Sequence, residues 1–155
     1  MTNASLTTQI QPRSPQGGFV NEPFIDFKAP ENARKMQAAL DLVSNQLGRE
    51  YDLIIGGRRL KTEGKIRSLN PARPAQIVGV HQKASAEHAE QAMAAALRAF
   101  EFWSRVSTEQ RVSLLLNAAE IIRARKFEFC AWLTFEVGKN WAEADADVGE
   151  TIDFL

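Results

Sequence analysis

Cysteine is nearly absent from this chain: Cys130 is the single one among 155 residues. One thiol excludes an internal disulfide and a zinc site built on cysteines, and it fits a reducing compartment such as the cytoplasm. Basic and acidic side chains balance at 19 each, so net charge favours neither nucleic acid nor an acidic membrane as a partner. The sequence also lacks the run of about 18 apolar residues that a membrane-spanning helix needs. We therefore predict a cytoplasmic protein with no nucleic-acid or membrane partner.

Motifs that bind phosphate or activate a nucleophile are missing as well. The sequence contains neither a GxGxxG nor a GxxxxGK pattern, and Gly56-Gly57 is more typical of a hairpin turn than of a phosphate loop. Cys130 lies among large apolar residues without a His or Lys in that cluster, so we expect a buried structural thiol. His81 and His88 are not spaced as a metal pair. The residues alone predict no catalytic, cofactor-binding or metal site.

The first half of the chain reads as a tail, a helix and several short strands. The first 20 residues are polar and rich in Ser, Pro and Gly, and we expect a disordered tail there, with 21–155 forming one incomplete domain. A helix should follow Pro30 and stop at Gly48. Short strands are expected at residues 53–55, 58–60, 66–69 and 76–81.

The second half is predicted to be helical. Ser85 is a good N-cap for a helix whose apolar stripe extends from Ala89 to Phe100. Ser107 and Gln110 form a capping-box pattern that opens a helix reaching about Arg125, and its broad apolar surface predicts the most buried helix of the chain. A further helical stretch should then end at residue 138, a glycine.

The last predicted helix carries the strongest positional signals. Asn140 is placed to cap it, with Glu143 reaching back as in a capping box. Phe154 falls on the same side as Glu150, which suggests that this side is partly covered. No stop signal precedes Leu155, so we expect the helix to continue beyond it. The apolar stripe comprises Trp141, Ala144, Val148, Ile152 and Leu155, and the opposite acidic face comprises Glu143, Asp147 and Glu150.

Five spaced segments carry a family resemblance. In order they are IIGGRRL, SLNPARPAQIVGVHQKAS, AALRAFEFWS, QRVSLLLNAAEIIRARKFEF and FEVGKNWAEADADVGETIDFL. They resemble the N-terminal part of the aldehyde dehydrogenase superfamily over about residues 51–155. The leading Asn21-Glu22-Pro23-Phe24 and the stretch GKNWAEADADV look most like the 1-pyrroline-5-carboxylate dehydrogenases, also called L-glutamate γ-semialdehyde dehydrogenases.

The resemblance implies an α/β fold, of which this chain would hold the N-terminal part: short strands followed by a helical block. It implies truncation before the dinucleotide-binding sheet and the catalytic domain, so NAD, the catalytic Cys and the general-base Glu would belong to the missing part, and Cys130 does not match the catalytic position. It also implies a small-molecule substrate and a homo-oligomer when complete. Glu150 matches a carboxylate that faces the α-amino end of the substrate in this group, and is the one substrate-binding residue expected here.

Three alternatives remain open at this point. The complete protein could be an aldehyde dehydrogenase acting on another aldehyde, or the dehydrogenase half of a fused proline-oxidising enzyme. It could also be a non-catalytic helical module for binding or assembly. The gene downstream of Leu155 separates these readings, because only an enzyme requires a catalytic-Cys segment and a nucleotide-binding segment there.

Overall fold

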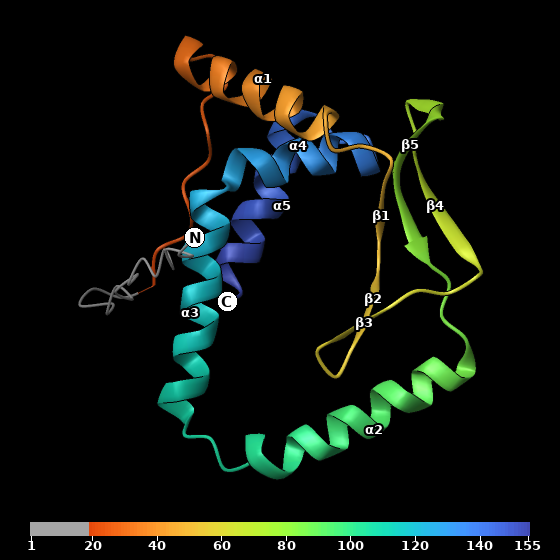
Figure 1. Cartoon of the computed structure of the whole chain (residues 1–155). Coiled ribbons are helices and arrows are strands. Elements are labelled where there is room, and N and C mark those ends of the chain that lie inside the picture. Colours follow the sequence, from red (N-terminus) through yellow and green to blue (C-terminus); the bar gives the residue numbers. More distant parts are fainter. Residues whose placement is uncertain (1–18) are drawn as a thin grey trace, which may run out of the picture.

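The computed structural model describes residues 19–155, so nearly all of the expected tail over residues 1–20 lies outside the described residues. The elements follow one another as two groups, strands first and helices second, with one helix ahead of the strands (Figure 1). They are α1 (Pro30–Ser44), β1 (Arg49–Tyr51), β2 (Leu53–Ile55), β3 (Arg58–Leu60), β4 (Lys65–Asn70), β5 (Arg73–Gln82), α2 (Ala86–Trp103), α3 (Thr108–Ala124), α4 (Lys126–Val137) and α5 (Trp141–Asp153).

The core lies where four helices meet. α4 packs against α1 on one side and α5 on the other, and α3 contacts both α4 and α5. The buried apolar side chains come from the stripes that the sequence predicts for α1 and α5, together with residues of α3 and α4. They are Met36, Ala39, Val43, Ala119, Cys130, Ala131, Ala144, Val148 and Ile152.

The strands form two small sheets. β1, β5 and β4 form one sheet in that order, with β1 parallel and β4 antiparallel to β5. β2 and β3 pair as the predicted antiparallel hairpin. β1 was not predicted, because its three residues show no apolar alternation and its partner, beginning at Gly79, is distant in sequence. β5 also begins earlier than predicted, at Arg73, next to irregular pairing between Ser68 and Asn70 that accommodates Pro74.

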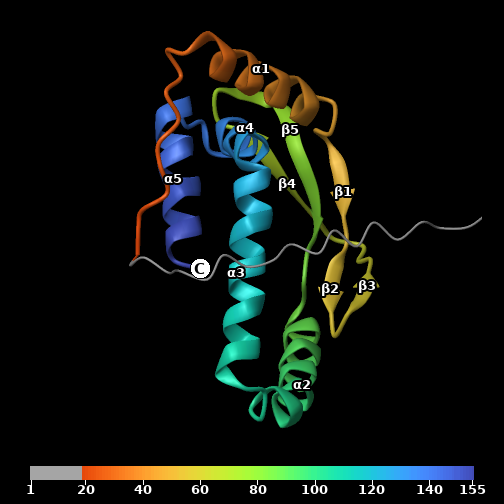
Figure 2. The same ribbon diagram turned by 90° about the vertical axis from the view of Figure 1, so that its left-hand side faces the viewer.

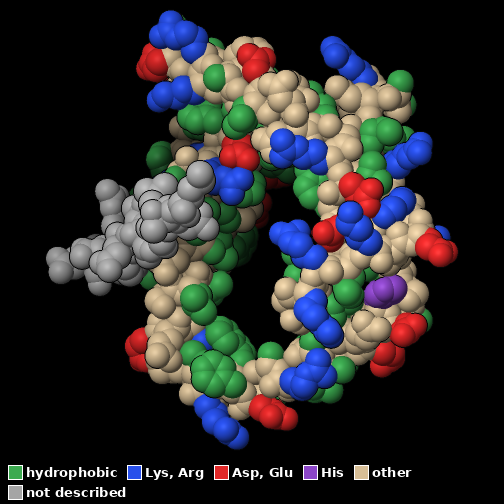
Figure 3. Space-filling model, in the orientation of Figure 1, with side chains coloured by type: hydrophobic (Ala, Val, Ile, Leu, Met, Phe, Trp, Pro, Cys, Tyr) green, Lys and Arg blue, Asp and Glu red, His purple; other side chains and the backbone are tan. Residues whose placement is uncertain are grey.

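Helices α2 and α3 expose most of their apolar stripes. The prediction that α3 is the most buried helix is wrong, because Ala119 is its one buried residue and Leu114 is 53% exposed. α2 has no buried residue at all and contacts the hairpin strand β2. In an open ring, α3 forms one side and α2 runs along the bottom (Figure 1), and hydrophobic side chains lie on the surface near their junction (Figure 3). The broad apolar stripes of α2 and α3 therefore form a surface that residues 19–155 do not cover.

The predicted capping at the starts of α2 and α3 is confirmed in part. The Ser85 hydroxyl accepts a hydrogen bond from the His88 backbone, and His88 completes a capping box for α2. The Ser107 hydroxyl accepts one from the Gln110 backbone at 3.2 Å, but the reciprocal half of the predicted box is not formed.

Among residues 19–155, no helix combines the length and hydropathy that a membrane crossing requires.

Candidate functional site

Helix α5 is positioned by the turn that precedes it. α4 ends at Gly138, whose φ of 74° lies in the left-handed region that favours glycine. A Cβ at this position would stand 2.9 Å from Cγ of Pro71, so the close approach of the β4–β5 turn also requires glycine. The Asn140 side chain accepts a hydrogen bond from the Glu143 backbone at 3.0 Å, and Glu143 accepts one from the Asn140 backbone at 3.4 Å. The predicted helix stop and capping box are both confirmed.

Helix α5 presents three faces. With about 100° between successive residues, its apolar stripe faces the core and its acidic face points away from it. A third face, comprising Asp145, Gly149 and Asp153, lies against the segment that precedes α1. Phe154, beyond the end of α5, is 82% exposed, so residues 19–155 do not provide the predicted partial cover over this side.

Glu150 differs from its neighbours on the acidic face. Asp147 is ion-paired with Lys139, and Glu143 is engaged in the capping box. Glu150 is exposed, and its carboxylate has no hydrogen-bond or ion-pair partner among residues 19–155. A carboxylate attracts a cationic group, and this one is not already neutralised by a neighbour. Of the three acids, Glu150 is therefore the one available to a ligand.

The third face of α5 is held by residues 19–29, which we call the strap. Figure 2 shows the strap, in red, running beside α5. The backbone N–H of Glu22 donates to the Asp153 carboxylate at 2.7 Å, and the Asn21 amide donates to it at 2.8 Å. Further along the strap, the backbone N–H of Ile25 donates to the Asp145 carboxylate at 2.7 Å. Two carboxylates on one face of α5 thus satisfy the exposed backbone of an extended segment.

A buried lysine completes this network. Lys126, at the start of α4, is 7% exposed, and its ammonium donates to the carbonyl oxygen of Pro23 at 2.8 Å. The same nitrogen lies 2.9 Å from the Asp145 carboxylate and 3.6 Å from that of Glu22. Arg123 of α3 binds the other oxygen of Glu22 at 2.8 Å. The ammonium is thereby compensated inside the protein, as a buried charge must be.

The strap contacts change the ionisation of Asp153. Hydrogen bonds from the Asn21 amide and the Glu22 backbone hold the pKa of the Asp153 carboxyl below its usual range. A depressed folded-state pKa stabilises the fold above the usual Asp value of about 3.9, and the contribution is lost as the pH falls below it. The contact of Asp153 with the strap is therefore present at neutral pH and weakens in acid.

Cys130 is a structural residue, as predicted. Its side chain is fully buried in the core, and burial raises the pKa of the thiol to about 11, with a further rise from the Asp145 carboxylate. Lys126, which the sequence reasoning did not count as a neighbour, acts in the opposite direction but does not outweigh burial. A nucleophilic cysteine needs a lowered pKa and access to substrate, and Cys130 has neither.

We expect Cys130 to resist alkylation. At pH 9 a thiol with a pKa near 11 is about 1% ionised, whereas an ordinary cysteine is mostly ionised, so iodoacetamide should react with Cys130 roughly a hundredfold more slowly. Mass spectrometry of the native protein over time measures the rate, with the unfolded protein in urea as the control. Equal rates in the two states would contradict the assignment.

The remaining sequence candidates have structural roles. His88 belongs to the N-terminal cap of α2, and His81 stacks on Tyr51 with ring centres 5.3 Å apart. Within the described part of the chain, no three His, Cys, Asp or Glu side chains converge on a position that could hold a metal ion.

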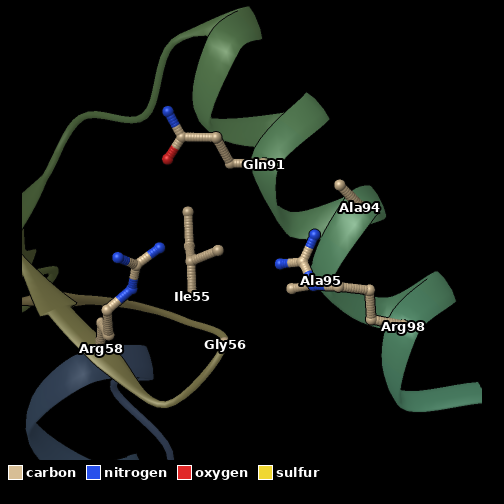
Figure 4. Close-up of a pocket in the computed structure, with 7 residues that line it drawn as sticks. All are labelled: Ile55, Gly56, Arg58, Gln91, Ala94, Ala95 and Arg98. Atoms are coloured by element: carbon tan, nitrogen blue, oxygen red, sulfur yellow. The ribbon is translucent and has the colours of Figure 1, made fainter.

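Gly56-Gly57 forms the predicted hairpin turn between β2 and β3. A recess of about 380 Å³ lies between this hairpin and the side of α2, and Arg58 and Arg98 flank Ile55 there (Figure 4). Dinucleotide phosphates bind where a glycine-rich turn opens a helix. This turn leads into a strand, and the recess lies beside the middle of α2 rather than at its N-terminus. This recess therefore does not fit a dinucleotide phosphate.

Comparison with known proteins places these features in a family. The sequence model of the aldehyde dehydrogenase family matches residues 59–155. The chain is 53% identical over 137 residues to 1-pyrroline-5-carboxylate dehydrogenase from Geobacillus thermodenitrificans (strain NG80-2), which covers 88% of this chain and 27% of that protein. The chain thus spans about a quarter of the length of this relative.

Solved structures agree with the sequence comparison. A structure of 1-pyrroline-5-carboxylate dehydrogenase from Thermus with bound NAD has a TM-score of 0.86 and 46% identity over 89% of this chain and 27% of the other. Proline utilization A from Bdellovibrio bacteriovorus has a TM-score of 0.87 and 40% identity over 93% of this chain and 15% of the other. The predicted fold, strands followed by a helical block matching the N-terminal part of that architecture, is confirmed. The chain belongs to the aldehyde dehydrogenase family.

Proposed function

We propose that this chain is the N-terminal part of an NAD-dependent enzyme that oxidises L-glutamate γ-semialdehyde, formed from 1-pyrroline-5-carboxylate, to L-glutamate in proline degradation. The observation that carries the proposal is the 53% identity to a 1-pyrroline-5-carboxylate dehydrogenase across most of this chain. We further propose a cytoplasmic location, in keeping with the single buried thiol, and assembly of the complete enzyme into a homo-oligomer.

Residues 19–155 contribute substrate recognition rather than bond-making in this proposal. Cys130 stays protonated and buried, and the Gly56-Gly57 turn leads into a strand rather than opening a helix as a dinucleotide site requires. The nucleophile, the general base and the NAD site therefore lie elsewhere in the enzyme. The oxidation itself requires a nucleophile that adds to the aldehyde carbon and an acceptor for the hydride that leaves it.

Glu150 is the residue of this chain that we assign to the substrate. Glutamate γ-semialdehyde carries an α-ammonium at the end opposite its aldehyde, and an unpartnered carboxylate is a matching group. The support is that Glu150 is exposed on a helix whose core face and strap face are both fixed. Contact at the amino end would orient the substrate while leaving its aldehyde free for reaction.

The proposal is tested with the complete open reading frame that contains this chain. Purified protein should reduce NAD in the presence of glutamate γ-semialdehyde, with kcat/KM clearly above that for an aldehyde of similar length without an amino group. Equal efficiency with both aldehydes would favour an aldehyde dehydrogenase of other specificity, and a frame without catalytic and nucleotide-binding segments would favour a non-catalytic module.

A fused enzyme is the second candidate, because proline utilization A also aligns with this chain, over 93% of it at 40% identity. A reading frame that also encodes a proline-oxidising domain, with NAD reduction supported by proline as well as by the semialdehyde, would establish the fusion. NAD reduction that is supported by the semialdehyde but not by proline would establish the separate dehydrogenase.

We expect the isolated 155-residue chain neither to bind NAD tightly nor to oxidise an aldehyde. The reason is that the described residues provide no glycine-rich phosphate turn at a helix N-terminus and no activated nucleophile. Isothermal titration calorimetry with NAD and a steady-state assay with the semialdehyde measure both properties, and the complete enzyme is the positive control. Micromolar NAD binding or turnover by the pure chain would contradict the expectation.

A further inference from the structure

We infer that the strap, anchored through Asp153, positions Glu150 and so contributes to the selection of aldehydes that carry an amino group. Asp153 acts in this account as a positioning residue that does not itself touch the substrate. The inference rests on the proposed function, because it assigns a role to residues behind the proposed substrate contact.

The strap holds α5 at two separate points. Near the start of the helix, Asp145 accepts from the backbone N–H of Ile25 at 2.7 Å. At its end, Asp153 accepts from Asn21 at 2.8 Å and from the Glu22 backbone at 2.7 Å. Residues eight apart on a helix are separated by about 12 Å along its axis. Two attachments at that separation restrain both the tilt of α5 and its rotation about its own axis.

The strap also packs against the turn of α5 that carries Glu150. Gly149, the preceding residue, is buried, and a Cβ built on it would stand 3.9 Å from Cβ and Cγ of Glu22. A methyl group at Gly149 would thus meet Glu22 at ordinary van der Waals distance, so the strap lies close to the helix there. Glu150 itself points about 100° away and is not covered by the strap.

The strap is itself fixed to the rest of the helical core. Glu22 is bound by Arg123 at 2.8 Å, and Lys126 donates to the Pro23 carbonyl at 2.8 Å. These two cations come from α3 and α4, so the strap ties α5 to both neighbouring helices. Glu22 is the central residue, since its backbone binds Asp153 while its side chain binds Arg123.

The direction of the Glu150 side chain depends on this arrangement. Because its carboxylate has no partner among residues 19–155, contacts of the side chain do not fix its position, and the helix backbone must do so. A binding group must be held within about 0.5 Å of its productive position, and misplacement by about 1 Å can cost a hundredfold in rate. Loss of the Asp153 anchor would loosen the part of α5 that carries Glu150, because Asp153 is only three residues beyond it.

Replacing Asp153 with Ala in the complete enzyme tests the inference. We expect kcat/KM for glutamate γ-semialdehyde to fall about three- to thirtyfold, mainly through KM, a range typical of coupling between neighbouring groups. The efficiency with an aldehyde that lacks the amino group should stay within about twofold of wild type, since that substrate does not use Glu150. The matched control is Asp41→Ala, which removes a carboxylate that accepts a hydrogen bond from Gln37 within α1, outside the strap and α5.

A double-substitution cycle with Glu150→Ala shows whether Asp153 acts through Glu150. If it does, Asp153→Ala should cause no further loss of selectivity once Glu150 is removed. An additive loss, or equal losses with both aldehydes, would overturn the inference and leave the proposed function standing. Unchanged selectivity in Glu150→Ala alone would overturn the proposed substrate contact and the inference together. If Asp153→Ala fails to fold, Asn21→Ala removes one of its two donors and should give a smaller loss of the same kind.

Discussion

Replacing Lys126 with Met should lower the free energy of local opening of helix α5 by about 3–5 kcal/mol. The substitution keeps an unbranched apolar chain but removes the ammonium, which leaves the carboxylate of Asp145, 1% exposed, without its cation. It also leaves the Pro23 carbonyl without its donor. Leaving a buried charge uncompensated is among the few single changes that cost this much.

Hydrogen exchange of the α5 amides in the complete enzyme measures this free energy, even where global unfolding is irreversible. The control is Arg125→Ala, which removes an ion pair with Glu128 in which the arginine is 53% exposed and should cost no more than about 1 kcal/mol. Combining Lys126→Met with Asp145→Asn should recover part of the loss, because Asn is neutral and can still accept from Ile25. A loss for Lys126→Met no larger than that of the control would refute the role of this buried network.

Replacing Glu150 with Ala should reduce kcat/KM for glutamate γ-semialdehyde roughly ten- to a hundredfold, since a hydrogen bond to a charged group contributes about 1.5–3 kcal/mol. The loss should appear mainly in KM, because the amino group is remote from the reacting carbonyl and the contact is equally strong in ground and transition states. Aldehydes without an amino group should be unaffected. Steady-state kinetics on both substrate types, with wild type and variant side by side, measures the difference.

Glu150→Gln is the matched variant for this prediction. It preserves the size of the side chain and one acceptor but removes the charge, so it should lose part of the selectivity that Glu150→Ala loses. The alternative is that Glu150 is an ordinary solvated carboxylate, which predicts a stability change within about 0.5 kcal/mol and no change in selectivity. Equal effects on both classes of aldehyde would exclude Glu150 from the substrate site.

The sequence predicted the local features of the fold well because each depends on neighbouring residues. Gly138 terminates α4 through its own backbone freedom, and Asn140 caps α5 through a residue three positions away. The hairpin at Gly56-Gly57 is equally local. β1 was missed because its stability comes from parallel pairing with a strand about 30 residues later, which no short pattern reports.

The predicted burial of α3 failed for a different reason. A broad apolar stripe shows that a helix is covered by something, and it does not show whether the cover lies in the same stretch of chain. Leu114 and Leu115 are 53% and 47% exposed here, so their partners are not among residues 19–155.

The polar network behind α5 was also missed, although a signal was present. At about 100° per residue, Asp145, Gly149 and Asp153 share one face of α5 that borders the core stripe, a position where unpaired carboxylates are costly. That face required a partner, and Lys126, which follows Arg123 and Arg125 at the start of α4, was a candidate cation. The strap residues that donate hydrogen bonds to this face are more than 100 residues away in the sequence, as Ile25 is from Asp145. Such tertiary contacts are visible only in the structure.

The most direct test of the account is a crystal structure of the complete enzyme with glutamate bound in the active site, since glutamate keeps the α-ammonium of the substrate. We expect one Glu150 carboxylate oxygen within about 2.7–3.2 Å of the glutamate nitrogen, with the strap still bound to Asp145 and Asp153. A structure in which the ammonium is held by other residues, while Glu150 faces solvent, would contradict the account.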